Sequence, residues 1–78
     1  MTSGEINPYQ ELANAIIKQA ADDYRKELMK LKKNPSDNDS RAKAAKIEDF
    51  FRSKWYSVLT SLDGESLIGM LKDQVGVE

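Results

Sequence analysis

The chain has 78 residues, which is enough for one small domain and too few for two. It contains neither cysteine nor histidine, which excludes disulfides, thiolate or imidazole metal ligands and the commonest general base at neutral pH. A net charge of −1 and a hydrophobic fraction of 40% are typical of a globular domain. We therefore expect a single domain over residues 1–78, with no cofactor, no metal site, no catalytic residues and no enzymatic activity.

The first predicted element is a long helix over residues 8–33. Asn7 is a favoured N-cap, and Pro8 suits the first helical position because its missing N–H would have no partner there. Apolar residues recur at spacings of three and four, as they do on the buried face of an amphipathic helix. These residues are Leu12, Ile16, Ala20, Tyr24, Leu28 and Leu31. Pro35 ends the helix, and residues 36–40 form a polar turn.

Two further helices are predicted after this turn, over residues 40–60 and 64–75. The inward positions of the second helix again follow spacings of three and four. They are Ala44, Ile47, Phe51, Trp55, Val58 and Leu62. Asp63 is a suitable N-cap for the third helix, and Gly76 closes it.

These elements predict an all-α fold. We expect the first two helices to form a long antiparallel hairpin, with the short third helix packed over the aromatic middle of the second. The predicted core consists of Leu12, Ile16, Tyr24, Phe51, Trp55, Leu67 and Leu71. No apolar stretch approaches the roughly 18–20 residues of a membrane span, and residues 1–5 lack the pattern of a secretory signal. A cytoplasmic protein without membrane contact is therefore expected.

Charge is distributed unevenly along the chain. Residues 18–54 hold eleven basic and seven acidic side chains, whereas the flanking segments hold one basic and six acidic. An antiparallel hairpin would gather several cations at one tip, and these are Lys30, Lys32, Lys33, Arg41, Lys43 and Lys46. Such a tip could contact the phosphates of a nucleic acid or a nucleotide. The alternative is a solvated surface that complements the helix dipoles.

A second candidate feature is the segment 52–56, in which Arg52 stands close to Trp55 and Tyr56. An arginine beside exposed aromatic rings is typical of an interface hot spot or of a site that stacks a base. If Tyr24 and Arg25 lie near it, Tyr24, Arg25, Arg52 and Tyr56 form a compact aromatic and cationic site. Alternatively, Phe51 and Trp55 belong to the core, and Arg52 only covers them with its aliphatic stem.

Several short blocks of the chain resemble a known group of proteins. The blocks are Asn7-Pro8-Tyr9, Ala15-Ile16-Ile17-Lys18-Gln19-Ala20, Asp23-Tyr24-Arg25, Leu31-Lys32-Lys33-Asn34-Pro35, Phe50-Phe51-Arg52-Ser53, Trp55-Tyr56, Leu59-Thr60, Leu62-Asp63-Gly64-Glu65 and Leu67-Ile68. Together they resemble short helical accessory proteins of prophages and conjugative elements of Gram-positive bacteria. The resemblance implies an accessory gene of a mobile element, and it assigns no site residues. Many such accessory proteins inhibit host defence, as anti-CRISPR proteins or as sponges for signal nucleotides, and others regulate by binding DNA.

Three hypotheses follow for function. The favoured one is a non-catalytic inhibitor that binds a host defence protein or its signal nucleotide. The alternatives are a small nucleic-acid-binding regulator, acting through the basic tip, and a helical oligomerisation module; self-association is also expected of the inhibitor. The candidate binding residues are Tyr24, Arg25, Lys32, Lys33, Arg41, Lys43, Lys46, Arg52 and Tyr56.

Overall fold

The structure is a computed structural model that describes residues 7–77. Its elements in this range are α1 (Pro8–Lys33), α2 (Asn38–Phe51), α3 (Lys54–Leu59) and α4 (Gly64–Val75). Residues 7–77 contain no strand, so the prediction of an all-α fold is confirmed. Residues 7–77 form four helices, whereas three were predicted.

The helix α1 has the bounds that its caps predict. The Asn7 side chain accepts hydrogen bonds from the backbone N–H groups of Tyr9, at 2.9 Å, and Gln10, at 3.3 Å. These two donors have no partner within the first turn of a helix, so the cap fixes the point at which α1 begins. At the other end, the Asn34 N–H reaches the Lys30 carbonyl at 2.8 Å and closes the last turn.

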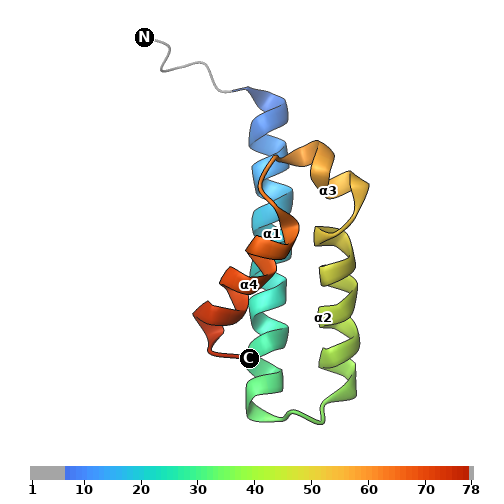
Figure 1. Ribbon diagram of the computed structural model, residues 1–78, viewed down its shortest axis with the longest axis vertical. Helices are drawn as coiled ribbons and strands as arrows, with labels where there is room; N and C mark the ends of the chain where they lie inside the picture. The colour runs from blue at the N-terminus through green and yellow to red at the C-terminus, as the bar shows by residue number, and fades with distance from the viewer. Residues whose placement is uncertain (1–6, 78) are drawn as a thin grey trace.

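The chain reverses between α1 and α2, which lie side by side and run in opposite directions (Figure 1). Asp37 caps α2 by accepting a hydrogen bond from the Ser40 N–H at 3.1 Å. The Arg41 guanidinium donates to the Pro35 carbonyl and ties the turn to the first part of α2. This helix therefore begins two residues before the predicted position.

The prediction of one continuous helix over residues 40–60 is wrong, because the helix is interrupted between Phe51 and Lys54. Ser53 makes the break: its hydroxyl donates to the Phe50 carbonyl at 2.6 Å and accepts from the Tyr56 N–H at 3.1 Å. This side chain therefore caps α3 and satisfies a carbonyl at the end of α2. The change of direction turns Tyr56 into the core, where it is 2% exposed.

The core lies where α1, α2, α3 and α4 meet. Tyr24, Phe51 and Leu71 are at most 1% exposed. The rings of Tyr24 and Phe51 meet edge to face at a centroid distance of 5.9 Å, and those of Phe51 and Tyr56 do so at 5.7 Å. Edge-to-face packing suits the quadrupoles of aromatic rings and adds to the gain from burial.

Two predicted core residues are wrong. Leu12 is 60% exposed and Trp55 is 56% exposed. Leu12 lies in the first turns of α1, where few other elements cover the helix (Figure 1). Trp55 faces outward because the break at Ser53 gives α3 a different orientation from α2. Ile16 is half-buried.

The last helix, α4, folds back along α1 (Figure 1). At its start, Gly64 lies so close to the end of α2 that an added Cβ would stand 2.0 Å from the Phe51 carbonyl oxygen. At its end, Gly76 adopts the left-handed conformation with φ +86° and donates to the Lys72 carbonyl at 2.9 Å. Within the described residues, no helix has the length and apolar character needed to cross a membrane.

Candidate functional site

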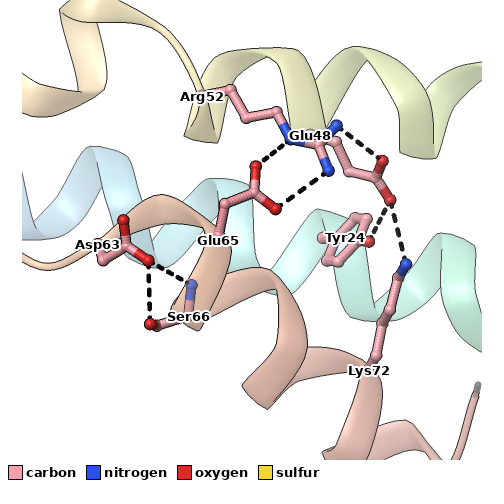
Figure 2. A network of polar contacts seen from close by, with 7 residues as sticks. All are labelled: Tyr24, Glu48, Arg52, Asp63, Glu65, Ser66 and Lys72. Carbon is pink, nitrogen blue, oxygen red and sulfur yellow. Dashed lines mark hydrogen bonds and ion pairs between the residues drawn. The ribbon is translucent and has the colours of Figure 1, made fainter.

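A cluster of polar side chains joins α1, α2 and α4 (Figure 2). The Tyr24 hydroxyl donates to Oε2 of Glu48, and the Lys72 ammonium lies 4.0 Å from the same oxygen. Arg52 lies 3.5 Å from Oε1 of Glu48. Burial and the hydrogen bond to Glu48 raise the pKa of Tyr24 well above its usual range. The cluster thus holds Tyr24 as a neutral donor and fixes α4 against the hairpin.

Arg52 contacts two carboxylates in this cluster. Besides Glu48, its guanidinium donates through two nitrogens to the two carboxylate oxygens of Glu65, in the first turn of α4 (Figure 2). This paired geometry is specific to arginine. The hydrogen bond from Arg52 lowers the pKa of the Glu65 carboxyl, and the same bond raises the pKa of Arg52.

The prediction of an aromatic and cationic site formed by Tyr24, Arg25, Arg52 and Tyr56 is wrong, because it required aromatic rings that are exposed to solvent. Both tyrosine rings are buried, at 0% and 2% exposed, so neither can stack on a ligand. Of the alternative interpretation, the placement of Phe51 in the core holds and that of Trp55 does not. The physical reason is the turn at Ser53, which exchanges the orientations of Trp55 and Tyr56.

The structure separates the nine predicted binding residues into different surroundings. Arg52 and Tyr56 line a hollow between α3 and the start of α4. Arg41 lines a second hollow, beside Glu48 and Lys72. Arg25, Lys32 and Lys33 come together in a third, between α1 and the end of α4, and we call this third hollow the α1–α4 groove.

The α1–α4 groove has a volume of about 600 Å³. Its lining residues are Arg25, Met29, Lys32, Lys33, Gln74 and Val75. The four on α1 stand at spacings of four, three and one, so they share one side of the helix. The hollow exists because α4 returns along this part of α1.

Hydrogen bonds hold two of the three cations in place. Nε of Arg25 donates to the Gln74 side-chain oxygen at 2.9 Å, and its NH1 donates to Asp22 at 2.7 Å. The Lys32 ammonium donates to the Val75 carbonyl at 2.9 Å and has two further donors. Lys33 is exposed and forms no ion pair within residues 7–77.

The cations surround an apolar surface. Met29 is 56% exposed, and Val75 is half-buried beside it. Among the described residues, no acidic side chain lines the groove, and the one acid paired with a groove cation is Asp22, which contacts Arg25 from the same helix. The arrangement therefore offers positive charge, free N–H donors and an adaptable apolar contact to the same ligand.

Two of the four remaining cations of the predicted basic tip are paired with acids on their own helices. Lys30 lies 3.7 Å from Glu27, and Lys43 lies 3.1 Å from Asp39. The hydrogen bond to Asp39 raises the pKa of Lys43. Lys46 is exposed on α2 and has no ion pair in the described part of the chain. The tip is thus a mixed surface rather than a continuous basic one.

Three residues of the α1–α4 groove were not predicted from sequence: Met29, Gln74 and Val75. Met29 flanks the apolar stripe of α1, and an apolar residue at the margin of the stripe is the one sequence signal that could have indicated a surface role. No protein-family model, curated protein or solved structure matches the chain. Residues 7–77 contain no group of three or more side chains suited to holding a metal ion.

Proposed function

We propose that this chain is a non-catalytic binding protein that holds an acidic partner in the α1–α4 groove. The observation that supports this most is the convergence of Arg25, Lys32 and Lys33 on the exposed side chain of Met29. Cations beside an apolar contact favour a ligand that carries negative charge on an apolar body. Arginine and methionine are also enriched at interfaces relative to the rest of protein surfaces.

The resemblance to accessory proteins of prophages and conjugative elements supports a role for this binding in a bacterial host that carries a mobile element. We propose that the partner belongs to a host defence system and that the chain inhibits it by occupying its surface. In this proposal the inhibitor is anti-CRISPR-like in mode, since it acts by binding and performs no reaction. Sequestration of a signal nucleotide through the same groove is a variant of this proposal.

Two alternatives keep specific support. A nucleic-acid-binding regulator is favoured by the exposure of Lys26, Lys33 and Lys46. The affinity of such a regulator for nucleic acid would fall as the salt concentration rises. Self-association is favoured by large apolar side chains that remain exposed on α1 and α3. These are Tyr9 at 84%, Leu12 at 60%, Trp55 at 56% and Val58 at 77%.

A phage plaque assay tests the proposal. The chain is expressed in a Gram-positive host with an active defence system, and plaques of a phage restricted by that system are counted. Wild type is expected to restore plaques, whereas the double variant Arg25→Gln with Lys33→Gln loses most of this effect. The matched control, Lys26→Gln with Lys46→Gln, removes the same charge outside the groove and is expected to behave as wild type.

Each alternative predicts a different pattern. A regulator that binds nucleic acid predicts equal losses in both double variants and a DNA mobility shift at low salt. An inhibitor that acts through its exposed apolar residues predicts that neither double variant matters and that Trp55→Ser with Val58→Ser abolishes protection. Either pattern contradicts binding through the α1–α4 groove.

A further inference from the structure

We infer that the ligand of the α1–α4 groove is a short peptide segment of a protein, with carboxylates flanking an apolar side chain, and is not a nucleotide. This inference rests on the proposed function and names the chemistry of its partner. It follows from three features of the groove: the spacing of its cations, the nature of its floor and the end of α4 that it faces.

The spacing of the cations suits two separate negative charges. Arg25 and Lys33 are eight residues apart on α1, which corresponds to about 12 Å along the helix axis at 1.5 Å per residue. Lys32 stands beside Lys33 and is already bound to the Val75 carbonyl. A single phosphate group can approach only one end of such a row, so the spacing separates a peptide from a mononucleotide, and the lining described below separates it from a dinucleotide. Two carboxylates separated by a few residues of peptide can approach both ends at once.

The floor between the cations suits an aliphatic side chain. Met29 lies between Arg25 and Lys32 in sequence and is exposed, with Val75 of α4 opposite. An unbranched thioether adapts its shape to varied apolar groups, which is typical of surfaces that bind peptides. A leucine or similar residue between two acidic ones would cover this floor.

The groove lacks what a nucleotide base requires. Within residues 7–77 its lining includes no aromatic ring on which a base could stack. Tyr24 and Tyr56 are buried, and Trp55 lies on α3, near the other end of the hairpin (Figure 1). The sequence-based hypothesis of a site that stacks a base depended on exposure of those rings, whereas the hypothesis of phosphate contacts at the basic tip did not.

The end of α4 that faces the groove also favours a peptide. Phosphates bind at helix N-termini, where free N–H groups and the positive end of the dipole meet them. Here α4 presents its C-terminal end, and the Val75 carbonyl accepts a hydrogen bond from Lys32. A peptide brings N–H donors to such carbonyls as well as carboxylates to the cations, whereas a phosphate brings acceptors alone.

An NMR titration of the ¹⁵N-labelled full chain tests the inference. The probe is a blocked hexapeptide of alternating glutamate and leucine, compared with peptides in which serine replaces leucine or lysine replaces glutamate, and with a cyclic dinucleotide. We expect saturable shifts in the amides of residues 25–33 and 72–77 with the first probe. Affinity should fall at least about fivefold for the serine peptide, because its apolar contact is lost. The lysine peptide and the dinucleotide should give no saturable shifts.

Variants of the chain make the result specific. Arg25→Gln with Lys33→Gln and, separately, Met29→Ser should each weaken the glutamate–leucine peptide, whereas Lys26→Gln with Lys46→Gln should not. A dinucleotide that binds as tightly as this peptide overturns the inference, and so does a serine peptide of equal affinity. If either occurs while the plaque assay still depends on Arg25 and Lys33, the proposed function stands and only the peptide inference falls. If the peptide does not bind and the plaque assay does not depend on Arg25 and Lys33, the proposed function is contradicted as well.

Discussion

Two polar regions of this small molecule use the same residue types in opposite ways. At the junction of α1, α2 and α4, Arg52 is bound by Glu48 and Glu65, and the Tyr24 hydroxyl is bound by Glu48. In the α1–α4 groove, Arg25 and Lys33 border an exposed Met29, and no acid faces them from α4 within the described residues. The junction satisfies its charges internally. In the groove, Arg25 is paired with Asp22 on its own helix, and the donors left for a ligand are mainly those of Lys32 and Lys33.

The identity of a cation therefore says little about its role in such a protein. What decides the role is whether another helix brings a carboxylate to it. Arg52 has two carboxylates within reach and serves to hold α4 in place. Lys33 has none and remains accessible. Substitutions at the contacts that hold α4 should therefore cost far more stability than substitutions in the groove.

The largest effect is expected for Gly64→Ala. The added Cβ would stand 2.0 Å from the Phe51 carbonyl oxygen, which is backbone and cannot turn aside. We expect the free energy of unfolding to fall by about 3 kcal/mol, as in other overpacked sites. Urea denaturation followed by circular dichroism measures it.

Gly69→Ala is the matched control for this change. Gly69 lies inside α4, and beyond its chain neighbours and the nearby backbone of its own helix no atom lies within 4 Å of the added Cβ. Alanine there should raise stability by roughly 0.5–1 kcal/mol, because it restricts the unfolded chain and favours helix. Similar losses in both variants would contradict close contact between α4 and the end of α2.

The next largest effect is expected for Tyr24→Phe. This change removes the donor to Glu48 and leaves a partly buried carboxylate with one partner fewer. Hydrogen bonds to charged groups contribute about 1.5–3 kcal/mol, so stability should fall by about 2 kcal/mol. Thermal unfolding provides the measurement.

Tyr56→Phe supplies the comparison for Tyr24→Phe. The Tyr56 hydroxyl is buried and has no hydrogen-bond partner in the described structure. Because removal of an unsatisfied buried hydroxyl relieves its desolvation cost, Tyr56→Phe should leave stability unchanged or raise it slightly. A large loss at Tyr56 with none at Tyr24 would contradict the hydrogen bonding described for the junction.

A smaller effect is expected on acidification. Arg52 lowers the pKa of Glu65 in the folded chain, and the Ser40 N–H lowers that of Asp37, relative to ordinary values of 4.5 and 3.8. The unfolded chain therefore takes up protons first, so the stabilisation is complete above the unfolded pKa values and is lost as the pH falls through the lower folded values. Urea midpoints measured between pH 7 and pH 2 should decline mainly below about pH 4.5.

Arg52→Gln is the variant that makes this pH effect specific. It removes the main cause of the lowered pKa of Glu65 and leaves the Asp37 cap intact. The decline in stability with acid should therefore become shallower. An unchanged pH profile would show that Arg52 does not hold Glu65.

The smallest effect on stability is expected for the groove. Arg25→Gln with Lys33→Gln removes only exposed or half-exposed charges, whose pairs contribute about 1 kcal/mol or less. The double variant should unfold within about 1 kcal/mol of wild type while it loses binding. A loss as large as that of Tyr24→Phe would instead place these cations among the structural ones.

Much of the fold was predictable because its helix ends are encoded locally. Asn7, Asp63 and Gly76 cap helices at the predicted positions, and each does so through contacts within a few residues. Tyr24, Phe51 and Leu71 were identified as core from periodicity alone, and the structure confirms them. Local caps and a regular apolar stripe do not depend on how the helices later assemble.

The break at Ser53 and the path of α4 were not predictable in this way. The apolar pattern runs through residues 50–59 without interruption, and a serine inside such a run becomes a cap only if the turn gains something elsewhere. Here the gain is the burial of Tyr56 against Phe51. The α1–α4 groove depends on the same return of the chain, so Met29 and Val75 could not be assigned to one site from sequence.

The most direct test of the central claim is photo-crosslinking in cells that carry the defence system. A photoreactive phenylalanine derivative replaces Met29 in one strain and Val58, which is 77% exposed on α3, in another. We predict a protein adduct at position 29 whose crosslinked peptide combines acidic and aliphatic residues. This adduct should disappear in the double variant Arg25→Gln with Lys33→Gln. An adduct with nucleotide or nucleic acid, or adducts formed at position 58 alone, would contradict this prediction.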